Sequence, residues 1–239
     1  MNNPRGPYPG RQLFLGLTAD KRPAVVYLVT GRSKESRERK AVPVANTIRM
    51  GPLGDIAYDP LRHYTAVKYD NASGTITVSN GIQTEAIYET YKLLFNVSSP
   101  LTKDYMAGIM DGANAEPDSY HTPRIAGVIV TGTTANSPAL IIGIKGYGQP
   151  AVATQIEPQP GVLTGIATYQ GNMDSPAATN PAAGLPDLKF SGITPEDLAR
   201  YVYDISQADY KGDDIRVCAV GIIRSADNRT WDIAIINAH

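Results

Sequence analysis

The amino-acid sequence predicts an α+β fold with stacked sheets and outer helices. The first observation is the order of the predicted elements: strands, two helices, strands, one helix and strands again. Such grouping argues against a doubly wound parallel sheet, in which strands and helices alternate one by one. The second observation is the content of 22 Gly and 18 Pro in 239 residues, an excess that indicates many turns and hence many strands. Apolar residues make up 42%, which is sufficient for a core, and we expect one domain over residues 1–239.

The first elements are predicted as strands. Short apolar runs at Leu13–Leu17 and Ala24–Thr30 are separated by turn residues, and the second run is rich in Val and Tyr. Tyr64–Tyr69 and Thr75–Ser79 flank the turn residues 71–74, which predicts a hairpin with a longer loop.

Three segments have the spacing or the start residues of a helix. Over Gln83–Phe95, apolar side chains recur at intervals of three and four residues. A second helix is predicted after Pro100, with Met106 and Met110 on its apolar face. A third begins at Thr194, because residues 194–197 supply a hydroxyl cap, a proline at the first position and two acids.

Further strands are predicted between and after these helices, at Ile125–Thr131, Ala139–Lys145, Val162–Tyr169, Ile215–Ile223 and Trp231–Ile236. Residues 171–192 are rich in Ala, Pro, Asn and Gly, and they are predicted to form an exposed loop.

Charge and hydropathy exclude several classes of protein. Lys and Arg (22) nearly balance Asp and Glu (23), so the net charge of −1 indicates neither a nucleic-acid nor an anionic-membrane partner. The longest apolar stretches have about seven residues, whereas a membrane span needs roughly 20. The N-terminus contains no apolar core of a signal peptide, which favours the cytoplasm. A homo-oligomer is compatible with these features.

Metal-ligating residues are few. The single cysteine, Cys218, excludes an internal disulfide and a cysteine-cluster zinc site. The three histidines, His63, His121 and His239, lack the spacing of a ligand set, so we expect no metal site.

A basic segment over residues 30–40 is the first candidate for chemistry. Arg32 and Arg37 follow a strand end and Gly31, where a turn could aim guanidinium and backbone N–H groups at a phosphate. The alternative is a solvated loop whose charge Glu35 and Glu38 balance. The segment lacks the pattern of a P-loop.

The densest cluster of charges is the second candidate. Glu116, Asp118 and Arg124 lie within nine residues, directly before an apolar strand, on a loop that Pro117 and Pro123 stiffen. Charges held at the end of a strand suit positioning and proton transfer. An Arg–carboxylate pair that only fixes the loop is an equally well supported alternative.

Two polar residues are candidates because of their local context. Tyr58 lies close to Arg62, and a phenol beside an arginine can act as acid, base or hydrogen-bond donor. The alternative is a half-buried aromatic residue with a satisfied hydroxyl. Asn80 ends a strand ahead of a helix, so it could present its amide to a ligand or, as is more common, cap the helix.

Six short motifs occur in this order: Tyr8-Pro-Gly-Arg11; Val29-Thr-Gly-Arg32-Ser33 with Arg37; Ile56-Ala-Tyr58; Val78-Ser-Asn80-Gly81 with Thr84; Glu116-x-Asp118-x-x-x-Thr122-Pro-Arg124-Ile125; and Ala167-Thr168-Tyr169. Together they make the sequence resemble the archaeal-type IMP cyclohydrolase family. Six motifs in order are far more specific than any one of them alone.

The resemblance implies an Ntn-hydrolase-like four-layer αββα sandwich. This fold would be used without the N-terminal nucleophile of true Ntn hydrolases, since the chain begins Met-Asn-Asn. It also implies the last step of purine biosynthesis, in which 5-formamidoimidazole-4-carboxamide ribonucleotide closes to IMP with loss of water. The substrate would be a purine nucleotide, and no cofactor or metal would be needed. Two departures, residues 34–36 in the second motif and an insertion at 171–192, leave open an altered substrate preference.

The resemblance further implies roles for individual residues. Arg11, Ser33, Arg37, Asn80, Thr122 and Tyr169 are expected to bind substrate, with Arg11 and Arg37 on the phosphate and Asn80 on the carboxamide. Arg32 and Tyr58 are expected to face the formyl oxygen, which gains negative charge during ring closure. Glu116 or Asp118 would accept the proton of the attacking nitrogen or hold Arg124.

Two other functions compete with this one. The first is a non-catalytic purine-nucleotide or phosphosugar binding protein on the same fold. The second is an amide hydrolase of Ntn type. The acids beside Arg124 favour the cyclohydrolase over a binding protein, and the missing N-terminal nucleophile counts against an amide hydrolase.

Overall fold

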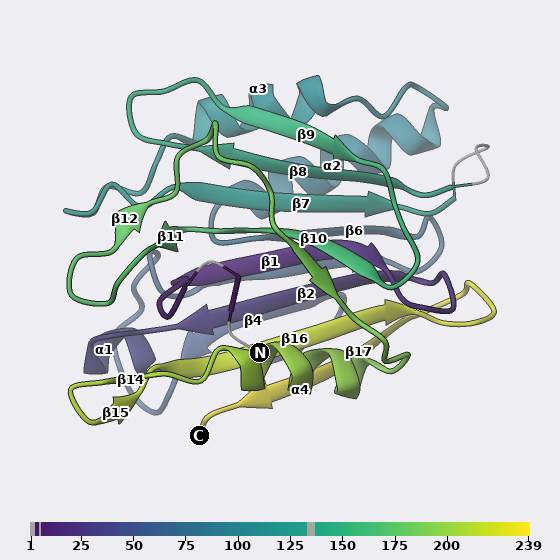
Figure 1. The fold of residues 1–239 in the computed structure, drawn as a ribbon. Coiled ribbons are helices and arrows are strands. Elements are labelled where there is room, and N and C mark those ends of the chain that lie inside the picture. Colours follow the sequence, from purple (N-terminus) through teal and green to yellow (C-terminus); the bar gives the residue numbers. More distant parts are fainter. Residues whose placement is uncertain (1–2, 5, 133–136) are drawn as a thin grey trace.

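Two antiparallel sheets lie face to face in the computed structural model, which describes residues 3–4, 6–132 and 137–239 (Figure 1). One sheet consists of β1 (Arg11–Leu17), β2 (Pro23–Thr30), β10 (Val162–Ala167), β13 (Asp187–Lys189), β16 (Arg216–Arg224) and β17 (Trp231–Asn237), in the order β13-β10-β1-β2-β16-β17. We call it the first sheet.

The second sheet follows the chain order, β3-β4-β5-β6-β7-β8-β9. Its strands are β3 (Arg39–Val44), β4 (Thr47–Pro52), β5 (Tyr64–Asp70), β6 (Thr75–Ser79), β7 (Arg124–Val130), β8 (Ala139–Lys145) and β9 (Val152–Ile156). Two short ribbons pair β11 (Tyr169–Gln170) with β12 (Ala177–Ala178), and β14 (Asp209–Tyr210) with β15 (Asp213–Asp214).

The main core lies between the two sheets. Successive side chains of a strand point to opposite faces. In β1, Leu13 and Leu15 therefore pack into the inter-sheet core, whereas Phe14 packs on the outer face. In β7, Ile125 and Ile129 face the inter-sheet core. Both faces of these strands are covered, so each strand is apolar along nearly its whole length.

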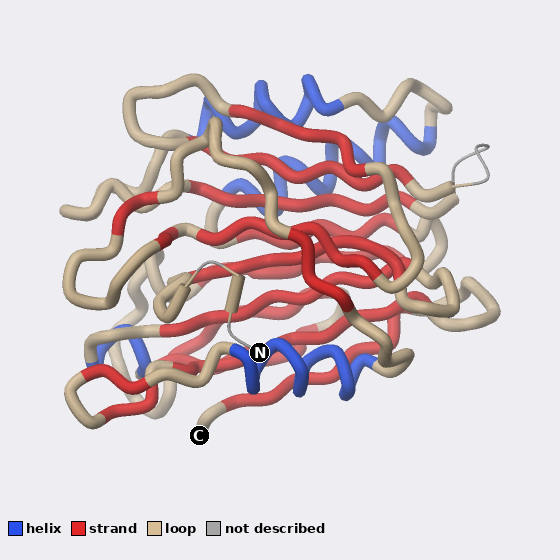
Figure 2. The backbone as a smooth tube through the Cα atoms, viewed as in Figure 1, coloured by secondary structure: helices blue, strands red, loops and turns tan. Residues whose placement is uncertain are grey.

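Helices cover the outer faces of both sheets (Figure 2). The helices α2 (Gln83–Asn96) and α3 (Lys103–Ala113) pack on the second sheet, and α4 (Pro195–Ile205) packs on the first. The Thr194 side chain caps α4 by accepting from the backbone N–H of Asp197 at 3.1 Å. The short helix α1 (Lys34–Arg37) follows β2. The layers therefore run helix, sheet, sheet, helix.

The α+β class is confirmed, and so are the hairpin, which is β5 and β6, and the three long helices. The prediction did not include β3, β4 and β9. Two prolines, Pro43 and Pro52, and several charged residues interrupt the apolar pattern of β3 and β4, and β9 is a largely exposed edge strand. Pairing with neighbouring strands, rather than local propensity, makes these segments extended.

Residues 171–192 are only partly the exposed loop that was expected. They include β12 and β13, and β13 pairs with β10 at the edge of the first sheet. Leu188 and the adjoining Phe190 are buried against α4. Loop-forming residues dominate the composition of this segment, but these two apolar side chains anchor its C-terminal part.

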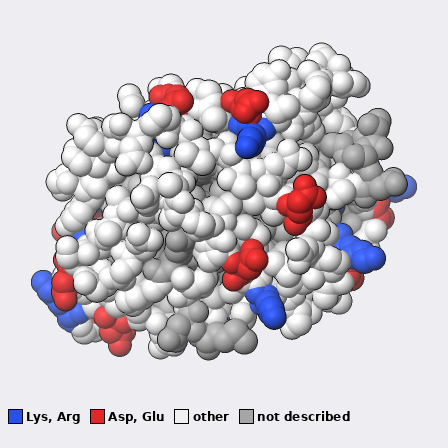
Figure 3. Space-filling view, turned by 45° about the horizontal axis from the view of Figure 1, so that its top comes forward, with Lys and Arg blue, Asp and Glu red and all other residues white. Residues whose placement is uncertain are grey.

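The surface carries no single dominant charge on the face that Figure 3 shows. Acidic and basic side chains lie there in separate small groups, with broad uncharged areas between them. No helix in the described part of the chain has the length and apolar character to cross a membrane.

Candidate active site

A buried carboxylate, Glu116, lies beside the first residues of β1 and β7, Arg11 and Arg124. Both strands begin on the left in Figure 1. The exposed fraction of Glu116 is 2%. The Oε1 atom accepts a short hydrogen bond from Nη2 of Arg11, and it lies 3.1 Å from Nη1 of Arg124 and 3.1 Å from Nδ2 of Asn80. Within the described residues no group donates to Oε2. One oxygen of this carboxylate is therefore held by three donors, while the other is unengaged.

The loop that carries Glu116 is fixed by its own hydrogen bonds. The backbone N–H of Glu116 donates to the Thr122 carbonyl at 2.9 Å. Asp118 accepts from the Thr122 backbone N–H at 2.8 Å and from its hydroxyl at 2.5 Å. His121 has a φ of 50°, which closes the turn. Together with the two prolines, these bonds hold Glu116 against the start of β7.

Asn80 uses its amide within the protein. Its Nδ2 donates to Glu116 and, at 2.9 Å, to the Pro123 carbonyl. Its Oδ1 accepts from the Ile125 backbone N–H at 2.8 Å and from the Gln83 side chain at 3.0 Å. All four hydrogen-bonding positions of the amide are occupied. Asn80 therefore positions Glu116, and it caps no helix.

Tyrosine side chains line the region next to this loop. The Tyr169 hydroxyl shares a short hydrogen bond with Thr122, and burial raises the pKa of Tyr169 to about 12. Its ring stacks on Tyr8 at a centroid distance of 5.6 Å. Arg32 lies over Tyr8 at 5.0 Å and over Tyr120 at 5.3 Å, and its guanidinium donates to the Met173 carbonyl. Tyr169 thus keeps its proton at neutral pH and can only donate or accept a hydrogen bond.

A second pair of tyrosines lies between the sheets beside Arg11. The hydroxyls of Tyr27 and Tyr64 are 2.7 Å apart, and both residues are buried. Burial and the proximity of Tyr64 raise the pKa of Tyr27 well above its ordinary value. Burial alone would lower the pKa of Arg11, but attraction to Glu116 and to both tyrosines outweighs it, so that pKa is raised. Arg11 is therefore a permanent buried cation.

The pKa of Arg124 shifts in the opposite direction to that of Arg11. Burial lowers its pKa, attraction to Glu116 raises it, and repulsion from Arg11 lowers it further; the net shift is downward. The value remains that of an arginine, which is charged at any physiological pH. Two cations therefore flank one buried anion.

The structure brings together most residues expected from the sequence. Glu116, Arg11, Arg124 and Asn80 form the polar cluster just described, and Asp118, Thr122, Tyr169 and Arg32 adjoin it.

Three expected site residues lie apart from this cluster. Tyr58 is 72% exposed on the loop between β4 and β5, where its ring contacts His63 at 5.6 Å. Ser33 is exposed and caps α1, since its hydroxyl accepts from the Ser36 backbone N–H. Arg37 pairs with Asp213 at 2.5 Å. In this structure neither Ser33 nor Arg37 contacts the Glu116 cluster.

Four buried residues that were not expected as site residues lie in the inter-sheet region near this cluster: Tyr27, Tyr64, His63 and Arg39, which belongs to the basic segment 30–40. Tyr27 and Tyr64 read as ordinary core residues, because only tertiary pairing joins their hydroxyls. Arg39 and His63 are 3% and 2% exposed, and their surroundings depend on β3 and β5, of which the first was not predicted. The sequence contains 14 Tyr and 3 Phe, a bias that favours aromatic faces with polar tips without identifying which tyrosines meet.

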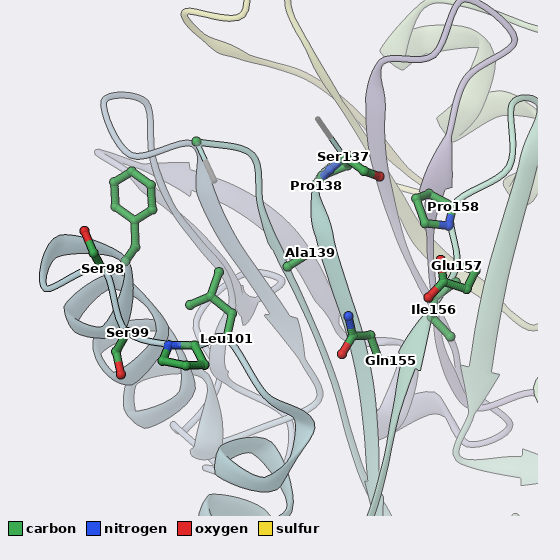
Figure 4. A pocket seen from close by; sticks show the side chains of 13 residues that line it. Ser98, Ser99, Leu101, Ser137, Pro138, Ala139, Gln155, Ile156, Glu157 and Pro158 are labelled. Carbon is green, nitrogen blue, oxygen red and sulfur yellow. The ribbon is translucent and has the colours of Figure 1, made fainter. Parts of the chain in front are cut away.

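A separate cavity of about 430 Å³ lies at the other end of β7, between the α2–α3 connection and β8 and β9 (Figure 4). Its labelled lining is mainly Ser, Pro, Gln and apolar residues, with the single acid Glu157. Gly132, on its wall, is eight residues beyond Arg124, which corresponds to about 26 Å along a strand. This cavity is therefore distinct from the Glu116 cluster. The described residues contain no group of three His, Cys, Asp or Glu side chains placed to hold a metal ion.

Comparison with known proteins identifies the family. Residues 8–228 match the family model described as IMP cyclohydrolase-like protein. The IMP cyclohydrolase of Halobacterium salinarum is 29% identical over 231 residues, which cover 96% of this chain and 98% of that protein. That of Methanococcus aeolicus is 30% identical over 199 residues, or 82% and 88% of the two chains. For Methanocaldococcus jannaschii the identity is 36% over 124 residues, which span 51% of this chain and 56% of that protein. The family match includes β1, the Glu116 loop and β7, and the chain belongs to the IMP cyclohydrolase-like family.

Proposed function

We propose that this protein is an IMP cyclohydrolase that closes the ring of 5-formamidoimidazole-4-carboxamide ribonucleotide to give IMP and water. The proposal rests on the hydrogen bonding of Glu116, in a chain that belongs to this family. Its Oε1 is held by Arg11, Arg124 and Asn80, and its Oε2 is not engaged. A carboxylate held in this way is oriented and retains one oxygen that can take a proton.

Ring closure requires such a group. The carboxamide nitrogen attacks the formyl carbon and loses a proton as the new C–N bond forms. An amide nitrogen is a weak nucleophile, so its orientation and the removal of its proton are the main requirements. We assign the proton to Oε2 of Glu116, and we assign Asn80 to positioning this carboxylate rather than to the substrate.

The formyl oxygen must be stabilised as it gains negative charge. It leaves as water with two protons, the one that Glu116 took from the carboxamide nitrogen and the one that the formamido nitrogen loses when the ring C=N bond forms. Arg124 is a buried cation 3.1 Å from Glu116, so it can face this oxygen when the carboxamide faces Oε2. Fixed donors in a buried site stabilise developing charge strongly. Arg32 and the protonated Tyr169 border the same region and are further candidate contacts. Tyr58 can take part only if its loop moves, because its side chain now points to solvent.

Two structural inferences accompany this function. The layer order and the antiparallel sheets support an Ntn-hydrolase-like αββα sandwich. The inter-sheet core draws on strands from β1 to β16, which supports one domain over residues 1–239. The substrate class, a purine nucleotide, follows from the family.

The direct test is to incubate the pure protein with the formamido nucleotide and to follow IMP by chromatography or absorbance. We expect enzyme-dependent formation of IMP that Glu116→Gln slows by roughly a hundredfold or more. If the protein binds IMP and the formamido nucleotide without turnover, it is a nucleotide-binding protein and the proposal is refuted.

A further inference from the structure

Arg39 is a buried cation on the inner face of the second sheet. It is the first residue of β3, and its exposed fraction is 3%. Alternate residues of a strand share a face, so Arg39 lies on the same face as Ala41, which belongs to the inter-sheet core. The side chain is thus placed in the space between the sheets and not on the surface.

The Arg39 guanidinium has no partner of opposite charge among the described residues. Its Nε and Nη1 atoms are buried and make no hydrogen bond. Arg37 and Arg216 pair with Asp213 and Asp214. The equally buried Arg224 has no carboxylate partner among the described residues, but it donates to the Asn71 carbonyl and to Asn228. Since an unpaired buried charge costs several kcal/mol, a group that compensates it is expected.

His63 presents a second unpaired donor. It is 2% exposed, and its Nδ1 accepts from the Asp59 backbone N–H at 2.9 Å. In the neutral ring the proton must then sit on Nε2, which is buried and makes no hydrogen bond. Burial and the positive charges of Arg62 and Arg39 lower the pKa of His63, although Asp59 opposes them, so the ring is neutral at pH 7. Arg39 and His63 lie at the same end of neighbouring strands, because Arg39 pairs with Pro52 of β4, and Met50 of β4 pairs with Tyr64, the residue after His63.

This pair adjoins the Glu116 cluster through the buried tyrosines. The charges of both Arg39 and Arg11 act on Tyr27, whose hydroxyl bonds to Tyr64. Among the described residues, the buried Arg11 and Arg124 share Glu116 as their ion-pair partner, and the buried Arg39 has none. The region has an excess of positive charge and of donors without acceptors.

We propose that Arg39 and His63 bind the 5′-phosphate of the nucleotide that reacts at Glu116. The inference rests on the proposed function for the identity of the ligand. A phosphate monoester dianion has only acceptor oxygens at its charged end, and a guanidinium matches its geometry. Arg39 would then replace Arg37, the phosphate contact expected from the sequence, which is already paired with Asp213.

The first experiment measures binding and requires no turnover. Affinities for IMP and for inosine, which lacks the phosphate, are compared by calorimetry in the parent protein, in Arg39→Met and in the matched control Arg37→Met. We expect Arg39→Met to weaken IMP binding at least thirtyfold and to leave inosine binding within twofold. Arg37→Met should leave both affinities within threefold.

The second experiment uses inorganic phosphate alone and thermal unfolding. Without phosphate, Arg39→Met should melt at or above the parent temperature, because an uncompensated buried charge has been removed. Phosphate at millimolar concentration should raise the melting temperature of the parent protein and of Arg37→Met, but not that of Arg39→Met. If Arg39→Met does not fold, Arg39→Lys keeps the charge and should bind IMP with intermediate affinity.

Equal losses of IMP and inosine affinity in the folded Arg39 variant would overturn the inference, as would stabilisation of that variant by phosphate. Its failure is distinguishable from failure of the proposed function. A protein that never forms IMP, but prefers IMP to inosine through Arg39, refutes only the reaction. A protein that forms IMP and binds it normally without Arg39 refutes only the subsite.

Discussion

The substitution Glu116→Gln separates chemistry from stability at the candidate active site. The change keeps the shape of the side chain and removes its charge. Arg11 and Arg124 then lose the one carboxylate with which either pairs among the described residues. Because Glu116 is 2% exposed, solvent cannot replace it.

The expected loss of stability follows from this burial. Removing one partner of a buried ion pair costs about 3–5 kcal/mol, and we expect the lower end because glutamine still accepts hydrogen bonds. For a chain of this size each kcal/mol lowers the melting temperature by about 2–4 °C, so the decrease should be roughly 10 °C. Loss of a general base should also lower kcat by roughly a hundredfold or more, with a smaller change in KM.

The assay combines calorimetric unfolding with the rate of IMP formation at a temperature where the variant is folded. A double variant, Glu116→Gln with Arg124→Met, removes one uncompensated cation and should recover part of the lost melting temperature. Its kcat should stay low. The control Glu85→Gln changes an exposed acid paired with Lys68, and it should alter neither quantity measurably. A Glu116→Gln variant that is destabilised but turns over at the parent rate would refute the base assignment and leave a purely structural ion pair.

Further predictions concern residues outside the central carboxylate. Tyr58→Phe should change kcat less than threefold, since the hydroxyl is solvent-exposed; a hundredfold decrease in steady-state assays would show instead that the loop brings it to the substrate. Burial raises the pKa of the Cys218 thiol to about 12, so at pH 9 a thiol reagent should modify the native protein at least a hundredfold more slowly than the unfolded chain; equal rates would contradict the buried placement. Dialysis against a chelator should leave full activity, because buried arginines supply the positive charge in this site; activity that returns only with a divalent ion would contradict this.

Local patterns along the sequence were sufficient to predict most of the helices and strands. The interval of three and four residues in α2, the cap of α4 and the apolar runs of β1, β2, β7 and β8 are local features, and each corresponds to an element that the structure contains. The loop from Glu116 to Arg124 could also be selected from the sequence, since charges, prolines and a following core strand are adjacent in the chain. Such features are local because backbone geometry repeats over a few residues.

Only the tertiary structure decided which polar residues meet. Arg11 and Glu116 are 105 positions apart. Arg11 begins β1 of the first sheet and Glu116 lies on the loop before β7 of the second, so the face-to-face packing of the two sheets brings them together. The same holds for Arg39, because proline and charged residues interrupt the apolar pattern of its strand. It holds also for Arg37, which the sequence indicated as a phosphate contact but which the fold pairs with Asp213. Local patterns fix which face of a strand a side chain occupies. Whether that face offers it a partner, solvent or an unfilled acceptor position depends on packing between segments far apart in the chain.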